Sequence, residues 1–131
     1  MPLTKSQSAQ ALEYVLKNVF NLDDEDILRE SLKHHGVTSI YDLIFMKKED
    51  VDRLTYAEEI DGVKQRVPIP WGKGQIINVF LDYLFYKEET GDSIDGKWTE
   101  IEKDDFNQFR TNTSYLRAGS WPKTVYLSSN L

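Results

Sequence analysis

The sequence contains no cysteine, which excludes disulfides, thiolate nucleophiles and cysteine-ligated zinc at once. It also lacks a long apolar run. The most apolar segment, residues 76–86, is interrupted by Asn78 and Asp82 and is far shorter than the ~20 residues of a membrane helix. The N-terminal residues carry no apolar stretch typical of a secretory signal. These absences predict an intracellular protein with no membrane partner.

Basic residues are outnumbered, with 16 Lys and Arg against 22 Asp and Glu, and the net charge is −6. The imbalance is strongest in residues 21–61, which hold twelve acidic and five basic side chains. An acidic surface repels phosphate backbones, so a nucleic-acid-binding helical domain remains only a second alternative. The same charge would suit a basic protein partner.

Histidine is also scarce, since the only two are the neighbours His34 and His35. Adjacent helical residues point about 100° apart, so this pair does not converge on one metal ion as an i, i+4 pair would. No Ser or Asp pattern marks either histidine as a general base. We therefore predict a non-enzymatic protein without cofactor, metal site or small-molecule substrate.

What is present is an ordinary globular composition, with 40% hydrophobic and 29% charged residues in a 131-residue chain. The periodicity predicts one compact all-α domain of five or six helices over residues 8–110. A flexible lead-in (1–7) precedes it, and a poorly ordered tail (111–131) follows. The first helix is expected to start near Ser8 and to bury Leu12, Val15, Leu16, Val19 and Phe20.

The next helix is expected to open at the acidic run 23–26 and to end at Gly36, in the left-handed conformation. Two very short helices should follow. The first is capped by Thr38 or Ser39, and the second lies within residues 48–54. Small helices packed around tight turns are typical of helical interaction modules.

Residues 55–70 form a polar connection that predicts either an irregular loop or a small hairpin turning at Asp61-Gly62. The central helix should run over residues 71–89, bury Ile76, Ile77, Phe80, Leu81, Leu84 and Phe85, and fold the Trp71 ring onto the core. A last helix is expected over residues 103–110.

One loop offers a metal-binding alternative. If Gly96 is the turn glycine of an EF-hand, residues 91–102 place Ser93, Asp95 and the twelfth-position Glu102 on ligand positions. The first ligand position then falls on Gly91, which has no carboxylate. A small calcium-binding helical module is therefore the first alternative function, and an acidic loop between helices is the default.

Exposed aromatic and basic residues near the short helices are the candidates for protein contact, because anchors of interfaces often lie beside turns. They are Tyr41, Phe45, Lys47, Lys48 and Tyr56. The alternative is a purely structural role, in which Tyr41 and Phe45 complete the core.

Two family resemblances bear on this expectation. His35-Gly-Val-Thr-Ser-Ile-Tyr-Asp-Leu through Glu49-Asp-Val-Asp-Arg-Leu54, with a closing helix from Trp71, resembles SAM-type (sterile alpha motif) domains. Its 55–70 connection is longer than that family usually has. Three segments carry the second resemblance: Glu49-Asp-Val-Asp-Arg-Leu-Thr-Tyr56, Val67-Pro-Ile-Pro-Trp-Gly-Lys-Gly-Gln through Tyr83, and Trp98-Thr-Glu-Ile-Glu-Lys-Asp-Asp-Phe through Arg110. They resemble the N-terminal, Gag-like region of copia-type retroelement polyproteins. That resemblance implies self-assembly or protein contact and supplies no active-site residues.

Overall fold

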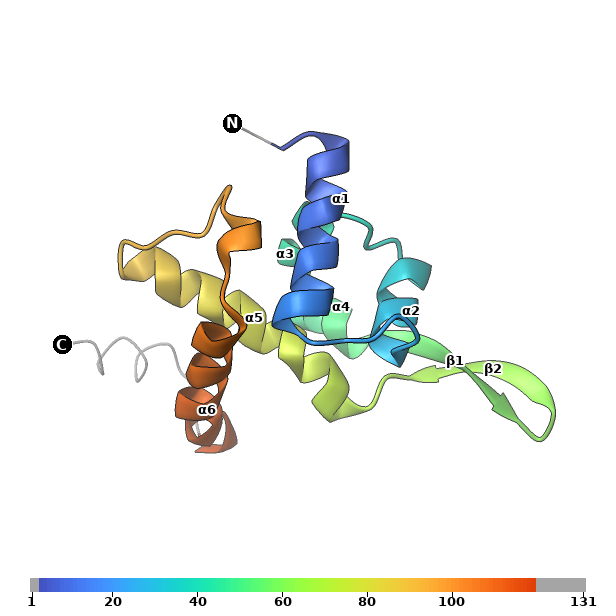
Figure 1. Cartoon of the computed structure of the whole chain (residues 1–131). Coiled ribbons are helices and arrows are strands. Elements are labelled where there is room, and N and C mark those ends of the chain that lie inside the picture. The colour runs from blue at the N-terminus through green and yellow to red at the C-terminus, as the bar shows by residue number, and fades with distance from the viewer. Residues whose placement is uncertain (1–2, 120–131) are drawn as a thin grey trace.

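The structure is a computed structural model that describes residues 3–119, with side chains described as far as residue 112. Its helices surround a single core, and one β-hairpin projects from them (Figure 1). In chain order the elements are α1 (Lys5–Tyr14), the π-helical turn η1 (Val15–Val19), α2 (Ile27–His34), α3 (Ile40–Ile44), α4 (Lys48–Asp52), β1 (Thr55–Ile60), β2 (Val63–Pro68), α5 (Trp71–Glu89), the 3₁₀ turn η2 (Trp98–Glu100) and α6 (Lys103–Gly119). The mostly helical prediction is confirmed, and the two-stranded sheet qualifies the all-α prediction.

The first helix begins at Lys5, earlier than the expected start near Ser8. The reason is a capping box at Thr4, whose Oγ1 accepts from the Gln7 N–H at 3.1 Å while Gln7 Oε1 accepts from the Thr4 N–H at 2.9 Å. The expected apolar face is confirmed as far as Phe20, which is 5% exposed. Asn21 then stops the helix in the left-handed conformation, with φ 59°.

The turn at Gly36 is confirmed, with φ 85° and the Val37 N–H donating to the Leu32 carbonyl at 2.8 Å. Of the acidic run before α2, only Asp26 caps the helix, by accepting from the Leu28 N–H at 2.9 Å. Of the two candidate caps for α3, Ser39 is the one used, and its Oγ accepts from the Asp42 N–H at 3.2 Å.

The hairpin alternative holds for residues 55–70. β1 and β2 pair antiparallel from Ile60↔Val63 to Thr55↔Pro68. Asp61 (φ 52°) and Gly62 (φ 81°) are both left-handed, as a two-residue type I′ turn requires. The Ile69 N–H donates to the Leu54 carbonyl at 2.9 Å and so closes the base of the hairpin before α5 begins.

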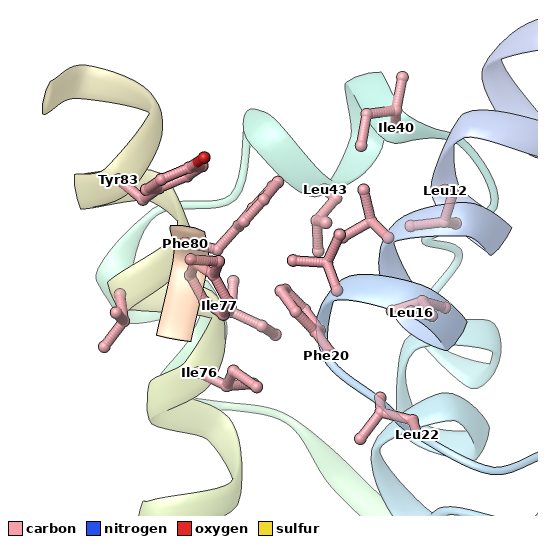
Figure 2. Packing of buried hydrophobic residues seen from close by; sticks show 14 of the residues in the cluster. Leu12, Leu16, Phe20, Leu22, Ile40, Leu43, Ile76, Ile77, Phe80 and Tyr83 are labelled. Atoms are coloured by element: carbon pink, nitrogen blue, oxygen red, sulfur yellow. The ribbon is translucent and has the colours of Figure 1, made fainter. Parts of the chain in front are cut away.

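Helix α5 is the centre of the core (Figure 2). Phe80 is fully buried, and Figure 2 shows Phe20 lying between Leu16 on one side and Ile77 and Phe80 on the other. The Phe20 and Phe80 ring centroids are 5.2 Å apart at 83°, the edge-to-face arrangement that aromatic quadrupoles favour.

Two predicted core contacts of α5 are wrong. Trp71 is 74% exposed and Phe85 is 37% exposed, whereas Tyr83 is buried at 1%. At about 100° per residue, Trp71 lies half a turn around the helix from Phe80, so it points away from the core. Phe85 lies about 140° from Phe80 for the same reason. Tyr83 is covered because α6 packs against that side, with Tyr83 and Phe106 centroids 5.4 Å apart.

The last helix continues past Arg110 to Gly119, farther than the sequence predicts. Phe106 and Phe109 are buried on one side of it, as expected from their spacing. The predicted tail lies outside the described residues from 120 onward. Among the residues that the structure covers, no helix is both long and apolar enough to cross a bilayer.

Candidate interaction surface

Phe45 is the most exposed large apolar side chain near the short helices, at 74% of its free surface. It follows α3, in which Ile40 and Leu43 are fully buried. The helical spacing places Phe45 about 140–160° from both of these residues, so burying them turns Phe45 outward. The prediction that Phe45 is available for contact therefore agrees with its position, and the alternative that it completes the core does not.

Phe45 stands between two open hollows. One of about 420 Å³ lies between α3, α5 and η2, and one of about 390 Å³ lies between the end of α2 and α4. The first hollow is lined by Tyr41, Ile44, Phe45, Leu84, Glu88, Ser93, Ile94, Asp95 and Trp98. The second is lined by His35, Gly36, Val37, Asp42, Phe45, Met46, Asp50, Arg53 and Leu54.

The first hollow combines an apolar floor with acidic groups. Leu84 is half-buried and Trp98 is 4% exposed, while the exposed Glu88 and Asp95 supply two carboxylates. The Trp98 indole N–H is buried and has no acceptor among the described residues. Such a hollow suits an apolar side chain accompanied by a cation.

The other four predicted contact residues lie in three different places. Tyr41 lines the same hollow as Phe45, is half-buried, and accepts a hydrogen bond from the Leu3 N–H at 3.2 Å. Lys47 and Lys48 are exposed where α4 begins, just after Phe45. Tyr56 lies on β1 and lines neither hollow. The residues that sequence reasoning missed, Leu84, Glu88 and Trp98, belong to α5 and η2.

A cluster of polar side chains links α5 to α6. The Tyr83 hydroxyl donates to Asp105 Oδ2 at 2.6 Å, and Lys87 Nζ lies 3.2 Å from the same oxygen and 2.8 Å from Asp92 Oδ2. Burial and the bond to Asp105 raise the pKa of the Tyr83 hydroxyl, and the bond to Asp92 raises the pKa of Lys87. The bond from Tyr83 lowers the pKa of Asp105. Each pKa shift favours the protonation state that makes these hydrogen bonds: neutral Tyr83, charged Lys87 and ionised Asp105. The cluster therefore connects the two helices and has no group whose pKa is shifted towards that of a general base or nucleophile.

The three predicted calcium ligands do not line one common hollow. Glu102 lines a hollow of about 370 Å³ beside the Tyr83–Asp105 cluster, and Asp95 lines the hollow beside Phe45. Ser93 lies between them and lines both. Within residues 3–112, no three His, Asp or Glu side chains come together in a way that would hold a metal ion.

His35 holds the base of the hairpin. Its Nε2 accepts from the Thr55 N–H at 3.1 Å and lies 3.0 Å from Thr55 Oγ1, which requires the neutral ring with its proton on Nδ1. Burial, followed by the positive charges of His34 and Arg66, lowers the pKa of His35. The neighbouring ring of His34 stands edge-on at 5.1 Å.

We expect the hairpin to loosen as the solution becomes acidic. Because the pKa of His35 is lower in the folded chain than its ordinary value of 6.5, the unfolded chain binds more protons below that value. Stability should therefore fall as the pH drops through 6.5 towards the lowered pKa, and the Thr55 amide should lose protection against hydrogen exchange. The His35→Gln variant, which cannot titrate, should show a flat profile. Equal protection of Thr55 in the wild type at pH 7 and pH 5 would contradict this.

Comparison of the chain with known protein families, with curated proteins and with solved structures finds no match to any of them.

Proposed function

We propose that this chain is a non-enzymatic interaction module that associates with a second copy of itself through the surface around Phe45. The observation that carries the proposal is that one surface holds both an apolar, basic group of residues and a hollow that complements it. An exposed aromatic ring followed by two lysines lies beside an apolar hollow that bears two carboxylates. A surface that contains both the anchor and its complement meets the requirement of a two-fold symmetric dimer, in which the same patch serves both partners.

In such a dimer, Phe45 of each copy enters the first hollow of the other copy, against Leu84 and Trp98. Lys47 and Lys48 then approach Glu88 and Asp95 of the partner. Fully burying one phenylalanine contributes about 1.5–3 kcal/mol, and the symmetry doubles that term. Association costs at least about 4 kcal/mol in lost freedom, which offsets most of the contribution of the two rings, so we expect a weak dimer with a dissociation constant in the millimolar range or above.

The resemblance of residues 12–110 to Gag-like regions leads to the same expectation, because that family's role is assembly. We include in the proposal that the chain is a Gag-like module of retroelement origin. The self-association argument stands on the Phe45 surface alone and would survive if that origin were wrong.

Size-exclusion chromatography with light scattering tests the proposal. The average mass should rise from 15.3 kDa in dilute samples towards twice that value near millimolar concentration. High salt should weaken the association, because it screens the exposed lysine–carboxylate pairs. A mass that stays at the monomer value throughout would contradict the proposal.

A further inference from the structure

The hairpin has one charged face and one largely apolar face. Alternate residues of a strand point to opposite sides, and the register fixes which side each pair occupies. Glu59↔Lys64 and Ala57↔Arg66 share one face. The opposite face carries Tyr56↔Val67, Glu58↔Gln65 and Ile60↔Val63. Ile60 is 38% exposed and Val63 is 57% exposed, so the tip of the second face is apolar and open to solvent.

Helix α2 occupies the outer edge of β1. The Thr55 N–H donates to His35 Nε2 at 3.1 Å, and the Ala57 N–H donates to Glu30 Oε1 at 3.2 Å. The Arg66 guanidinium crosses to the same helix, with Nη1 at 2.5 Å from Glu30 Oε1. Both outward donors at the base of β1 are therefore satisfied within the molecule.

The outer edge of β2 has no such cover. In a hairpin with a two-residue turn, the pairs 60/63, 58/65 and 56/67 exchange the ladder hydrogen bonds. The backbone N–H and C=O groups of Lys64 and Arg66 consequently point away from β1. Both residues are exposed, and within residues 3–119 no partner for these backbone groups is found. Pro68, which has no N–H, ends this edge.

From this open edge we infer that β2 binds an extended segment of another protein in which acidic and apolar residues alternate. The segment adds a third strand, as in β-augmentation, and hydrogen-bonds to the backbone of Lys64 and Arg66. Its acidic residues face Lys64 on the charged side, while its apolar residues lie beside Val63 and Val67 on the other. This site is separate from the Phe45 surface and does not depend on the proposed self-association.

A second copy of this chain is a poorer occupant of the edge. Antiparallel pairing of two β2 strands about Gln65 would set Lys64 of each copy opposite Arg66 of the other. Directly opposed like charges destabilise a strand pair, and an edge lysine is a common device against such pairing. Arg66 is already paired with Glu30, whereas Lys64 forms no salt bridge within the part of the chain that the structure describes. Lys64 is therefore the charge on this edge that favours an acidic segment.

The test uses the full chain and two synthetic probes, the peptides Val-Glu-Val-Glu-Val and Val-Lys-Val-Lys-Val, blocked at both ends. We expect the acidic peptide at millimolar concentration to shift the NMR signals of the Lys64 and Arg66 amides and to slow their hydrogen exchange. The Lys64→Pro variant removes one outward N–H but no bond of the hairpin ladder, and it should weaken binding about tenfold or more. Lys64→Ala retains that N–H and should weaken binding only about two- to fivefold.

Protection of the Gln65 amide serves as the control that the hairpin still forms in both variants. Unchanged Lys64 and Arg66 signals with the acidic peptide, or equal binding of both peptides, would overturn the inference. So would a Phe45→Ala protein that still dimerises and becomes monomeric on adding Lys64→Pro, because a second copy would then occupy the edge. The mass of the Lys64→Pro variant measured by light scattering should match that of the wild type. The proposed self-association is therefore tested separately from peptide binding at the β2 edge.

Discussion

Replacing Phe80 with alanine should lower the free energy of unfolding by about 3–5 kcal/mol, the largest effect we expect from any single substitution. Phe80 is fully buried and meets Phe20 at 5.2 Å and Phe106 at 5.7 Å between ring centroids. It therefore joins the end of the first helix to both α5 and α6. Removal of the ring leaves a cavity where three separate elements meet. None of the three can move to fill the cavity without disturbing its contacts with the other two.

Urea denaturation followed by circular dichroism measures this loss. Since domains of this size are stable by about 5–15 kcal/mol, the variant should be marginal or unfolded at 25 °C. Phe85→Ala on the same helix is the matched control, because its ring is 37% exposed and its loss should cost clearly less. Equal destabilisation by the two substitutions would contradict the position of Phe80 at the centre of the core.

Replacing Phe45 with alanine should leave the stability of the fold nearly unchanged and weaken self-association instead. Its ring is 74% exposed in the single chain, so the free energy of unfolding should change by no more than about 0.5 kcal/mol. The dissociation constant of the dimer should rise at least about tenfold, because each interface loses both of its aromatic anchors. Light scattering at matched concentrations measures the effect.

Phe85→Ala again provides the control, since that ring is also on the surface but lines neither hollow beside Phe45. It should leave the dissociation constant unchanged. A Phe45→Ala protein that associates as strongly as the wild type would show that another surface is responsible.

Local signals account for what the sequence predicted well. The Gly36 stop and the Asp61-Gly62 turn depend on backbone conformations that few residues adopt, and both were identifiable from residue type alone. The buried face of the first helix follows from its spacing. The capping box at Thr4 is a local signal that the prediction misses, although its Thr-Lys-Ser-Gln pattern is visible in the sequence.

The errors in the predicted core concern which side of α5 is covered by other elements. Its sequence is apolar around most of the helix, so periodicity does not distinguish Phe85 from Tyr83. The choice is made by α6, whose Phe106 and Phe109 pack on the Tyr83 side at 5.4 and 5.6 Å between centroids. The Trp71 ring is predicted to fold onto the core from the first turn of the helix, but its position on the helix turns it outward.

The candidate surface was only half predictable for a similar reason. Tyr41 and Phe45 stand near a visible helix stop, and the following lysines are adjacent in sequence. The complementary half comes from Leu84, Glu88 and Trp98, which tertiary packing brings to α3 from a distant part of the chain. No local pattern connects the two halves.

Charge reversal with mixing tests the central claim, self-association through the Phe45 surface, most directly. The variants Lys47→Glu/Lys48→Glu and Glu88→Lys/Asp95→Lys should each be monomeric by light scattering, because like charges oppose each other across both halves of a symmetric dimer. Mixed in equal amounts, they should form a heterodimer, since every lysine–carboxylate contact is then restored. If the separate variants dimerise like the wild type, or if the mixture remains monomeric while the wild type dimerises, the account of this surface is wrong.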